Sequence, residues 1–299
     1  MKRIIPVFLL ISLAMACGKN QDVKPTPQDE ANPTPTDETR IPINISFPIT
    51  KVTDVAYESG DIVGLYVVNE GTALASSGNH ANNVAYTFDG SAWSATTELY
   101  WKDQSTKASF YCYYPRLGSV TDVSAIPCAV NANQSTPAGY KSSELLWGSR
   151  ENVAPTSDVV NITTTHRMSN LLVYIAPGNG YTTESIKQEN IEILLNNLKV
   201  NATLNAATGE VTATGNPADI TPYQDGDRFR ALVPPQTLDN QTLVSLKVGD
   251  YSFSLKQTIT LKSNTQHKVT ITVNKVSEGI NIGIGDWETD EVDYGGTVN

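Results

Sequence analysis

Apolar and polar residues alternate along much of the chain, and the clearest alternation lies near its N-terminal end. In the segment IPINISFPI every odd position is apolar, namely Ile41, Ile43, Ile45, Phe47 and Ile49. A period of two places these side chains on one face of a β-strand. Pro42 and Pro48 lack an amide proton, so each weakens pairing on one side. We therefore expect an edge strand whose side chains still fill a core.

Short segments of the same kind follow at regular spacing, separated by turn residues. They are residues 61–68, 83–88, 91–95, 99–101, 108–114, 145–147, 159–165, 171–175, 191–195, 199–205, 210–214, 228–233, 243–248, 251–255 and 267–273. Asp89-Gly90 is a strong signal for a two-residue hairpin turn. Only residues 182–189 suggest a turn or two of helix. Such a series predicts an all-β fold, either a sandwich or a barrel.

The strand-rich part is long enough for two sandwiches of ordinary size. We expect an N-terminal domain over residues 41–167 and a C-terminal domain over residues 168–299, which ends in a short acidic tail exposed to solvent. No linker sequence separates VNITTTH from NLLVYI, so the two domains are expected to pack closely.

The first forty residues predict export rather than a fold. Lys2 and Arg3 precede an apolar run over residues 4–13, which is typical of a secretory signal peptide, here residues 1–16. Small residues then lead directly to Cys17, as in a bacterial lipobox, so we expect cleavage before Cys17 and a lipid on its thiol. The alternative is an ordinary signal peptide with an incidental cysteine. Residues 17–40 are rich in proline and polar residues, which predicts a flexible tether.

The net charge of the chain argues against one class of protein, those that bind nucleic acids. The chain carries 21 basic and 31 acidic residues, a formal net charge of −10. A strongly basic nucleic-acid-binding protein is therefore excluded as the default interpretation, because nothing here would neutralise a phosphate backbone.

Sites for metals, cofactors or catalysis are not evident. His80, His166 and His267 show no metal-ligand spacing, and no GxSxG or Walker sequence is present. The acidic residues near the C-terminus lack the spacing of a calcium loop. We expect no metal, no cofactor and no enzymatic activity. Cys112 and Cys128 could form a disulfide in an exported protein, although two buried free thiols are favoured.

The aromatic residues suggest a second possibility, a surface that stacks against sugars. Trp101 and Trp147 lie in strand-like segments and are expected to belong to the core. Tyr111 and Tyr113, on the face of their strand opposite Phe110, are the better candidates for an exposed adhesive surface.

The order of these segments is similar to that of a known family. The sequence contains, in order, GDIVGLYV, ELYW, SFYCYYP, ELLWGS, LNAATGEV, FRALVPPQT and HKVTITVNK. Together with the lipobox, this series resembles the fimbrillin family of Bacteroidales, the subunits of type V pili and related surface lipoproteins. The resemblance implies two tandem transthyretin-like β-sandwich domains, export to the cell outer membrane and assembly into a surface fimbria.

The resemblance also implies a mode of assembly. Such subunits lose an N-terminal strand to an arginine-specific protease, and the opened groove accepts a strand from the next subunit. The exchangeable strand would be residues 41–49. A cut after Arg40 would keep this strand, whereas a cut after Lys51 would open the groove but would require cleavage after lysine. The short acidic tail is a poor donor strand, which favours a tip, anchor or accessory subunit that contributes to adhesion.

The partners implied are other pilus subunits, the outer membrane through the lipid, and surface ligands of a host or bacterium. The alternative hypothesis is a lipoprotein of the outer membrane that binds glycans without polymerising.

Overall fold

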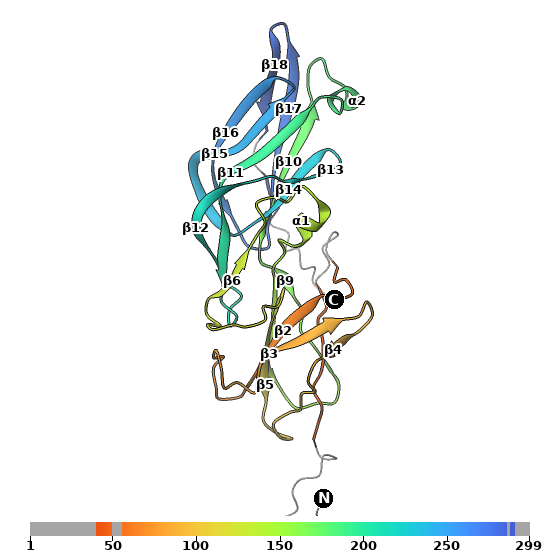
Figure 1. The fold of residues 1–299 in the computed structure, drawn as a ribbon, viewed down its shortest axis with the longest axis vertical. Coiled ribbons are helices and arrows are strands. Elements are labelled where there is room, and N and C mark those ends of the chain that lie inside the picture. Colours follow the sequence, from red (N-terminus) through yellow and green to blue (C-terminus); the bar gives the residue numbers. More distant parts are fainter. Residues whose placement is uncertain (1–39, 50–55, 286–287, 291–299) are drawn as a thin grey trace, which may run out of the picture. The chain divides into compact units, whose positions relative to one another are not determined.

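A computed structural model describes residues 40–49, 56–285 and 288–290, and its regular structure is almost all β (Figure 1). The strands of the first half are β1 (Asn44–Ser46), β2 (Ile62–Asn69), β3 (Ala81–Phe88), β4 (Trp93–Ala95), β5 (Ala108–Tyr114), β6 (Ile126–Ala129), β7 (Leu146–Val153), β8 (Val159–Asn161), β9 (Thr165–His166) and β10 (Ser169–Pro177). Those of the second half are β11 (Ile191–Leu204), β12 (Val211–Ile220), β13 (Tyr223–Asp225), β14 (Arg228–Val233), β15 (Gln236–Val248), β16 (Tyr251–Leu261), β17 (Gln266–Val276), β18 (Gly279–Ile284) and β19 (Glu288–Asp290). The helices are α1 (Pro137–Lys141) and α2 (Thr183–Ile186).

The strands form four sheets. Sheet I has the order β4-β3-β2-β5-β7-β9, and sheet II is the parallel pair β1-β8. Sheet III has the order β12-β11-β15-β16, with β6 also paired to β11. Sheet IV has the order β13-β14-β10-β17-β18, with β19 also paired to β17.

Two hydrophobic clusters hold these sheets together. The first cluster joins side chains of residues 41–49, the first strand, which includes β1, to those of sheet I and β8. It includes Val63, Leu65, Phe110 and Val160. The other lies among the strands of sheets III and IV and extends to Tyr66 and Tyr113 of sheet I. Inward-facing apolar residues alternate with polar ones along most strands, which is why the sequence forms stacked sheets rather than helices.

The all-β prediction is confirmed, and most expected strands are present. A hairpin joins β3 to β4 around Asp89-Gly90, but its loop comprises residues 89–92 rather than two residues. Gly90 has a φ of +104°, which favours glycine. The strands expected at 191–195 and 199–205 form one long strand, β11, with irregular pairing between them. The turn expected at 182–189 contains α2, which begins with a capping box between Thr182 and Ser185.

Three expectations need correction. Tyr113 is 1% exposed rather than a surface residue, because the second cluster covers that face of β5. The acidic tail is not wholly solvated, since its residues 288–290 pair with β17 as β19. The first strand is not a simple edge, because its backbone bonds to neighbours on both sides, as described below.

Trp101 is buried as expected, while Trp147 is half-buried and packs against the second cluster. Among the residues that the structure describes, no helix is long and apolar enough to span a bilayer.

Candidate functional site: the groove of the first strand

The first strand lies between two other segments of the chain. On one side, the N–H of Ile43 donates to the carbonyl of Leu99 at 2.8 Å, and the N–H of Trp101 donates to the carbonyl of Ile41 at 2.9 Å. On the other side, Ile162 and Thr164 donate their N–H groups to the carbonyls of Ser46 and Pro48, both at 2.9 Å. At its start the strand is therefore bonded through odd-numbered residues to the segment 99–101. Toward its end it is bonded through even-numbered residues to the segment 162–164.

The two prolines, Pro42 and Pro48, are even-numbered residues, whose backbone groups point to the side of β8. Backbone groups of successive residues in a strand point to opposite sides, so Pro42 and Pro48 lack the N–H that would face β8 and the residues after it. Pro48 contributes a carbonyl acceptor and no donor to this pairing. The first strand consequently depends on side-chain burial more than an ordinary strand does.

The odd side chains point into the first cluster. Ile43, Ile45 and Phe47 are 6%, 8% and 2% exposed, whereas Ile41 and Ile49 are half-buried. The ring of Phe47 packs edge-on against Tyr86 and Trp93, with centroid distances of 5.4 and 5.0 Å. Each of the three buried side chains contributes roughly 1.5–3 kcal/mol by leaving water.

A hollow of about 990 Å³ lies along the strand on its solvent side. Its lining comes from the first strand, from β3 and β4, from the segment around Tyr100 and from β8. Part of the strand is thus reachable from solvent while its apolar face is buried.

The far end of the groove is closed by Tyr57, the second residue after the gap in the described chain. Its ring packs edge-on against Trp93 at 4.7 Å and against Tyr114 at 5.6 Å. Its hydroxyl lies 3.1 Å from Oγ1 of Thr164. Burial raises the pKa of Tyr57 far above its usual range. Thr164 therefore contacts both the end of the first strand and the chain that follows it.

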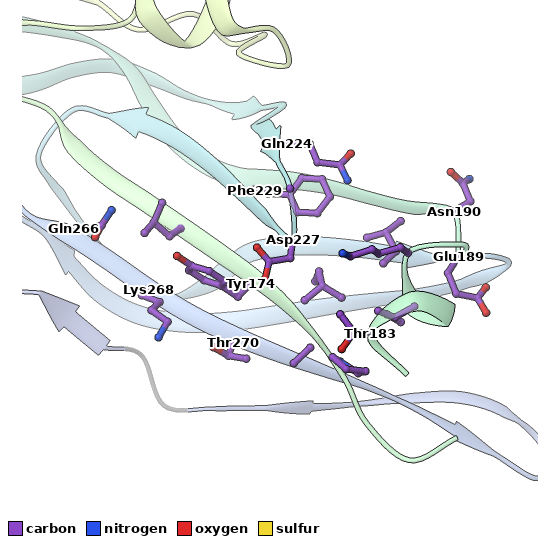
Figure 2. A pocket seen from close by; sticks show the side chains of 18 residues that line it. Tyr174, Thr183, Glu189, Asn190, Gln224, Asp227, Phe229, Gln266, Lys268 and Thr270 are labelled. Atoms are coloured by element: carbon purple, nitrogen blue, oxygen red, sulfur yellow. The ribbon is translucent and has the colours of Figure 1, made fainter. Parts of the chain in front are cut away.

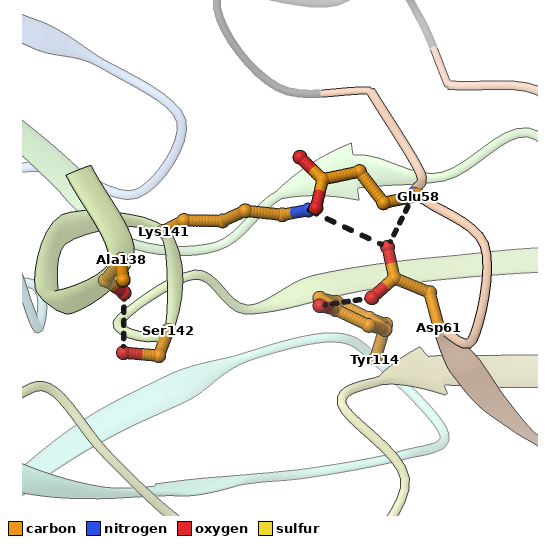
Figure 3. Close-up of polar contacts among 6 residues, drawn as sticks. All are labelled: Glu58, Asp61, Tyr114, Ala138, Lys141 and Ser142. Atoms are coloured by element: carbon orange, nitrogen blue, oxygen red, sulfur yellow. Dashed lines mark hydrogen bonds and ion pairs between the residues drawn. The ribbon is translucent and has the colours of Figure 1, made fainter.

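A polar network fixes the next residues (Figure 3). Asp61 accepts through Oδ2 from the N–H of Glu58 at 2.7 Å and through Oδ1 from the hydroxyl of Tyr114 at 3.0 Å. Lys141 of α1 places Nζ 2.6 Å from Oε2 of Glu58 and 3.9 Å from Oδ2 of Asp61. Burial, followed by the charge of Asp61, raises the pKa of Tyr114. Residues 58–61 are thereby attached to β5 and α1 independently of the first strand.

The positions expected from the sequence are placed as follows. Arg40 is exposed, and its guanidinium carbon lies 4.1 Å from the ring centroid of Tyr100. Lys51 and Cys17 lie outside the described residues. The sequence pattern did not identify Tyr57, Thr164 or Lys141, since each is a single residue without a motif, and only the isolated tyrosine just after the strand offered a signal.

The cysteines and histidines considered in the sequence do not form a catalytic or metal site among the described residues. Cys112 and Cys128 are free thiols, and burial raises the pKa of both. Nδ1 of His166 lies 2.9 Å from Oε2 of Glu144, and both side chains are buried. In the described part of the chain, no group of three or more His, Cys, Asp or Glu residues could hold a metal ion.

Comparisons with known sequences agree with this fold. The sequence model of a family described as "Fimbrillin-like" matches residues 50–287. The chain is 24% identical over 304 residues to the "Putative fimbrium subunit Fim1C" of Bacteroides uniformis, covering 96% of each chain. It is also 30% identical over 124 residues to the "Putative fimbrium tip subunit Fim1C" of Bacteroides ovatus, which covers 40% of this chain and 22% of that one.

Solved structures show the same fold at low identity. A "putative cell adhesion protein" of Bacteroides uniformis superposes with a TM-score of 0.65 at 19% identity, over 87% of this chain and 99% of that one. A fimbrial protein of Bacteroides ovatus superposes with a TM-score of 0.53 at 19% identity, over 80% of this chain and 49% of that one.

Proposed function

The chain belongs to the fimbrillin-like family, and from this premise we propose that it is a lipid-anchored accessory subunit, at the tip or the anchor, of a type V pilus. It is exported, lipidated at Cys17 and held at the cell outer membrane. An anchor subunit keeps this lipid, whereas a tip subunit loses it when the chain is cut after Lys51. Residues 41–167 and 168–299 act as two sandwich domains. The protein contributes to adhesion and has no catalytic role.

Assembly proceeds by exchange of the first strand, residues 41–49. The observation that carries this proposal is that the first strand buries its apolar side chains but has two prolines, Pro42 and Pro48, which cannot donate backbone hydrogen bonds. Ile43, Ile45 and Phe47 are buried, so their removal would expose an apolar groove at a cost of several kcal/mol. Pro48 offers no N–H to its neighbour, so fewer hydrogen bonds oppose departure of the strand. An incoming strand with the same apolar alternation would restore both the burial and the backbone bonds.

The chain after the gap supports the same proposal. Tyr57, Glu58 and Asp61 are bonded to β5, to Thr164 and to α1. The contacts of Asp61 with Tyr114 and of Glu58 with Lys141 do not involve the first strand, so residues 58–61 would stay in place once it had gone. The groove would then remain shaped for a replacement strand.

The position of the cut decides between two outcomes. Cleavage after Lys51 would release the strand together with the lipidated tether. Cleavage after Arg40 would release the tether and leave the strand in the groove. Arg40 is exposed, so a protease could reach it, but only the cut after Lys51 produces an acceptor.

A tip or anchor role is supported by the pairing of β19. Residues 288–290 are already bonded to β17 of their own subunit, and the residues after Trp287 are rich in acidic side chains. Residues of this kind offer little to fill the apolar groove of another subunit. The relative with the word tip in its name matches over part of this chain, which agrees with this role.

The N-terminal sequence of the protein recovered from pili tests the proposal. A start at Val52 is the expected result for an acceptor subunit. A lipidated Cys17 joined to an intact first strand in every pilus-bound molecule would contradict strand exchange by this subunit, although it would still agree with an anchor.

A further inference from the structure

A second hollow lies away from the first strand, in the part of the fold built on sheet IV. It has a volume of about 770 Å³. β10, α2 with the residues after it, the turn between β13 and β14, and β17 all contribute side chains (Figure 2). Its size falls within the range of about 300–1,000 Å³ that is typical of small-molecule sites.

The lining includes an apolar part. Leu172, Ile175, Ile186 and Phe229 are buried, and Tyr174 is half-buried. An aromatic ring and aliphatic side chains of this kind contact the C–H-rich surface of a ligand.

The same hollow carries neutral hydrogen-bonding groups and the carboxylate of Asp227. In Figure 2, Gln266, Tyr174 and Thr270 lie toward one end, Thr183 and Asn190 lie toward the other, and Asp227 and Gln224 lie between them. Asp227 and Gln224 are exposed, so their polar atoms are available to a ligand. Planar amide and carboxylate groups can each bond to two neighbouring hydroxyls.

The charged groups of the lining balance. Lys187 and Lys268 oppose Glu189 and Asp227. Glu189 accepts from the hydroxyl of Tyr181 at 2.9 Å, and Nζ of Lys268 lies 5.3 Å from the ring centroid of Tyr174. No excess of either sign attracts an anion or a cation. A purely apolar ligand would leave the polar groups without hydrogen-bond partners, which disfavours its binding.

We propose that this hollow binds a neutral saccharide. A sugar ring combines an apolar C–H face with a rim of hydroxyl groups, and this is the combination that the lining matches. Tyr174 packs against the C–H face, and Asp227 and Gln224 accept from and donate to adjacent hydroxyls. The site lies outside the groove of residues 41–49 and does not depend on strand exchange. Its role in adhesion rests on the proposed function, to which it adds the ligand class, neutral saccharides.

The test uses the full-length protein in detergent on an array of neutral and acidic oligosaccharides, followed by calorimetric titration of the neutral oligosaccharides that bind. Asp227→Asn keeps the size of the side chain, and no hydrogen bond or ion pair of its carboxylate contributes to the contacts described above. Tyr174→Ala removes the ring. Tyr251→Ala is the matched control, since Tyr251 is a tyrosine of sheet III that does not line the hollow and is 41% exposed. Thermal unfolding of each variant checks that it folds.

We expect binding of at least one neutral oligosaccharide, with about a tenfold or greater loss in Asp227→Asn and in Tyr174→Ala and no loss in Tyr251→Ala. The proposal is overturned if no neutral oligosaccharide binds, if acidic ones bind in preference, or if both pocket variants fold and bind as the unmodified protein does. None of these results bears on cleavage at Lys51, so failure here is distinguishable from failure of the strand exchange.

Discussion

The backbone N–H of Thr164 and the carbonyl oxygen of Pro48 form a hydrogen bond of 2.9 Å at the end of the first strand. Thr164 is fully buried, and its Oγ1 also lies 3.1 Å from the hydroxyl of Tyr57. A buried N–H without an acceptor costs about 1–3 kcal/mol. Any strand that replaces residues 41–49 must therefore present a carbonyl at this position.

Phe47 should be the main side-chain anchor of the first strand. Phe47→Ala removes a ring that packs against Tyr86 and Trp93, and we expect a loss of about 3–5 kcal/mol in the free energy of unfolding. Asn44→Ala, at an exposed position of the same strand with one bond to Ser157, should cost less than about 1 kcal/mol. Urea unfolding of both variants measures the difference, and equal losses would show that Phe47 does not anchor the strand.

Asp61 should contribute more to the free energy of unfolding than the ion pair between Glu58 and Lys141. Asp61→Ala leaves the hydroxyl of Tyr114 and the N–H of Glu58 without their acceptor, with an expected cost of about 1–3 kcal/mol. Glu58→Gln removes only the charge partner of Lys141 on a side chain that is 72% exposed, with an expected cost below about 1 kcal/mol. Denaturant unfolding distinguishes them, and a larger loss in Glu58→Gln would reverse this assignment.

His267 should make the fold sensitive to mild acid. Burial, followed by the charge of Lys262, lowers the pKa of His267, and its Nε2 accepts from the N–H of Lys262 at 3.1 Å. The unfolded chain takes up a proton near pH 6.5 while the folded chain resists it, so stability is present above that pH and falls as the pH falls below it.

The variant His267→Gln cannot titrate in this range, so its unfolding free energy should change less between pH 7 and about pH 5.5 than that of the unmodified protein. The buried pair of His166 and Glu144 is retained in both proteins, so the comparison isolates His267. Identical pH dependence in the two proteins would count against a neutral buried His267.

Gly209 should be intolerant of a side chain because of Trp147. A Cβ at Gly209 would overlap the indole ring of Trp147, whereas a Cβ at Gly226 would meet nothing within 4 Å. The two glycines have similar φ values, +73° and +67°, so each alanine variant pays about 1–2 kcal/mol of backbone strain. Gly209→Ala should lose roughly a further 1–3 kcal/mol from overpacking. Equal unfolding free energies would contradict a close contact with Trp147.

How far the sequence predicts the fold depends on whether one or both faces of a strand are buried. In the first strand only the odd positions are buried, so a period of two was visible in the sequence. In β5 both faces are buried. Phe110 and Cys112 point into the first cluster, and Tyr113 points into the second cluster from the opposite face. Periodicity therefore indicated the strand correctly but could not indicate that Tyr113 is buried.

Two elements without a clear sequence signal, β6 and α1, are held mainly by tertiary contacts. β6 is four residues long and pairs with β11, which lies far along the chain. α1 is capped by Thr136, whose hydroxyl accepts from the N–H of Gly139. Its buried Tyr140 packs against Tyr223 of β13 and Arg230 of β14. Short segments of this kind carry too little local pattern to be recognised. The candidate groove was predicted from its strand, but Thr164 and Tyr57 required the fold.

Exchange of the first strand can be measured most directly with a labelled peptide of residues 41–49. A recognition sequence for a site-specific protease replaces residues 50–55, and a matched control carries the same sequence in place of residues 34–39, before the strand. After cleavage, fluorescence anisotropy follows uptake of the peptide. The account predicts that only protein cut after the strand takes up the peptide, and that a peptide with Phe47→Ala binds at least about a hundredfold more weakly. Uptake that is absent after this cut, or equal in the uncut protein and the control, would contradict strand exchange.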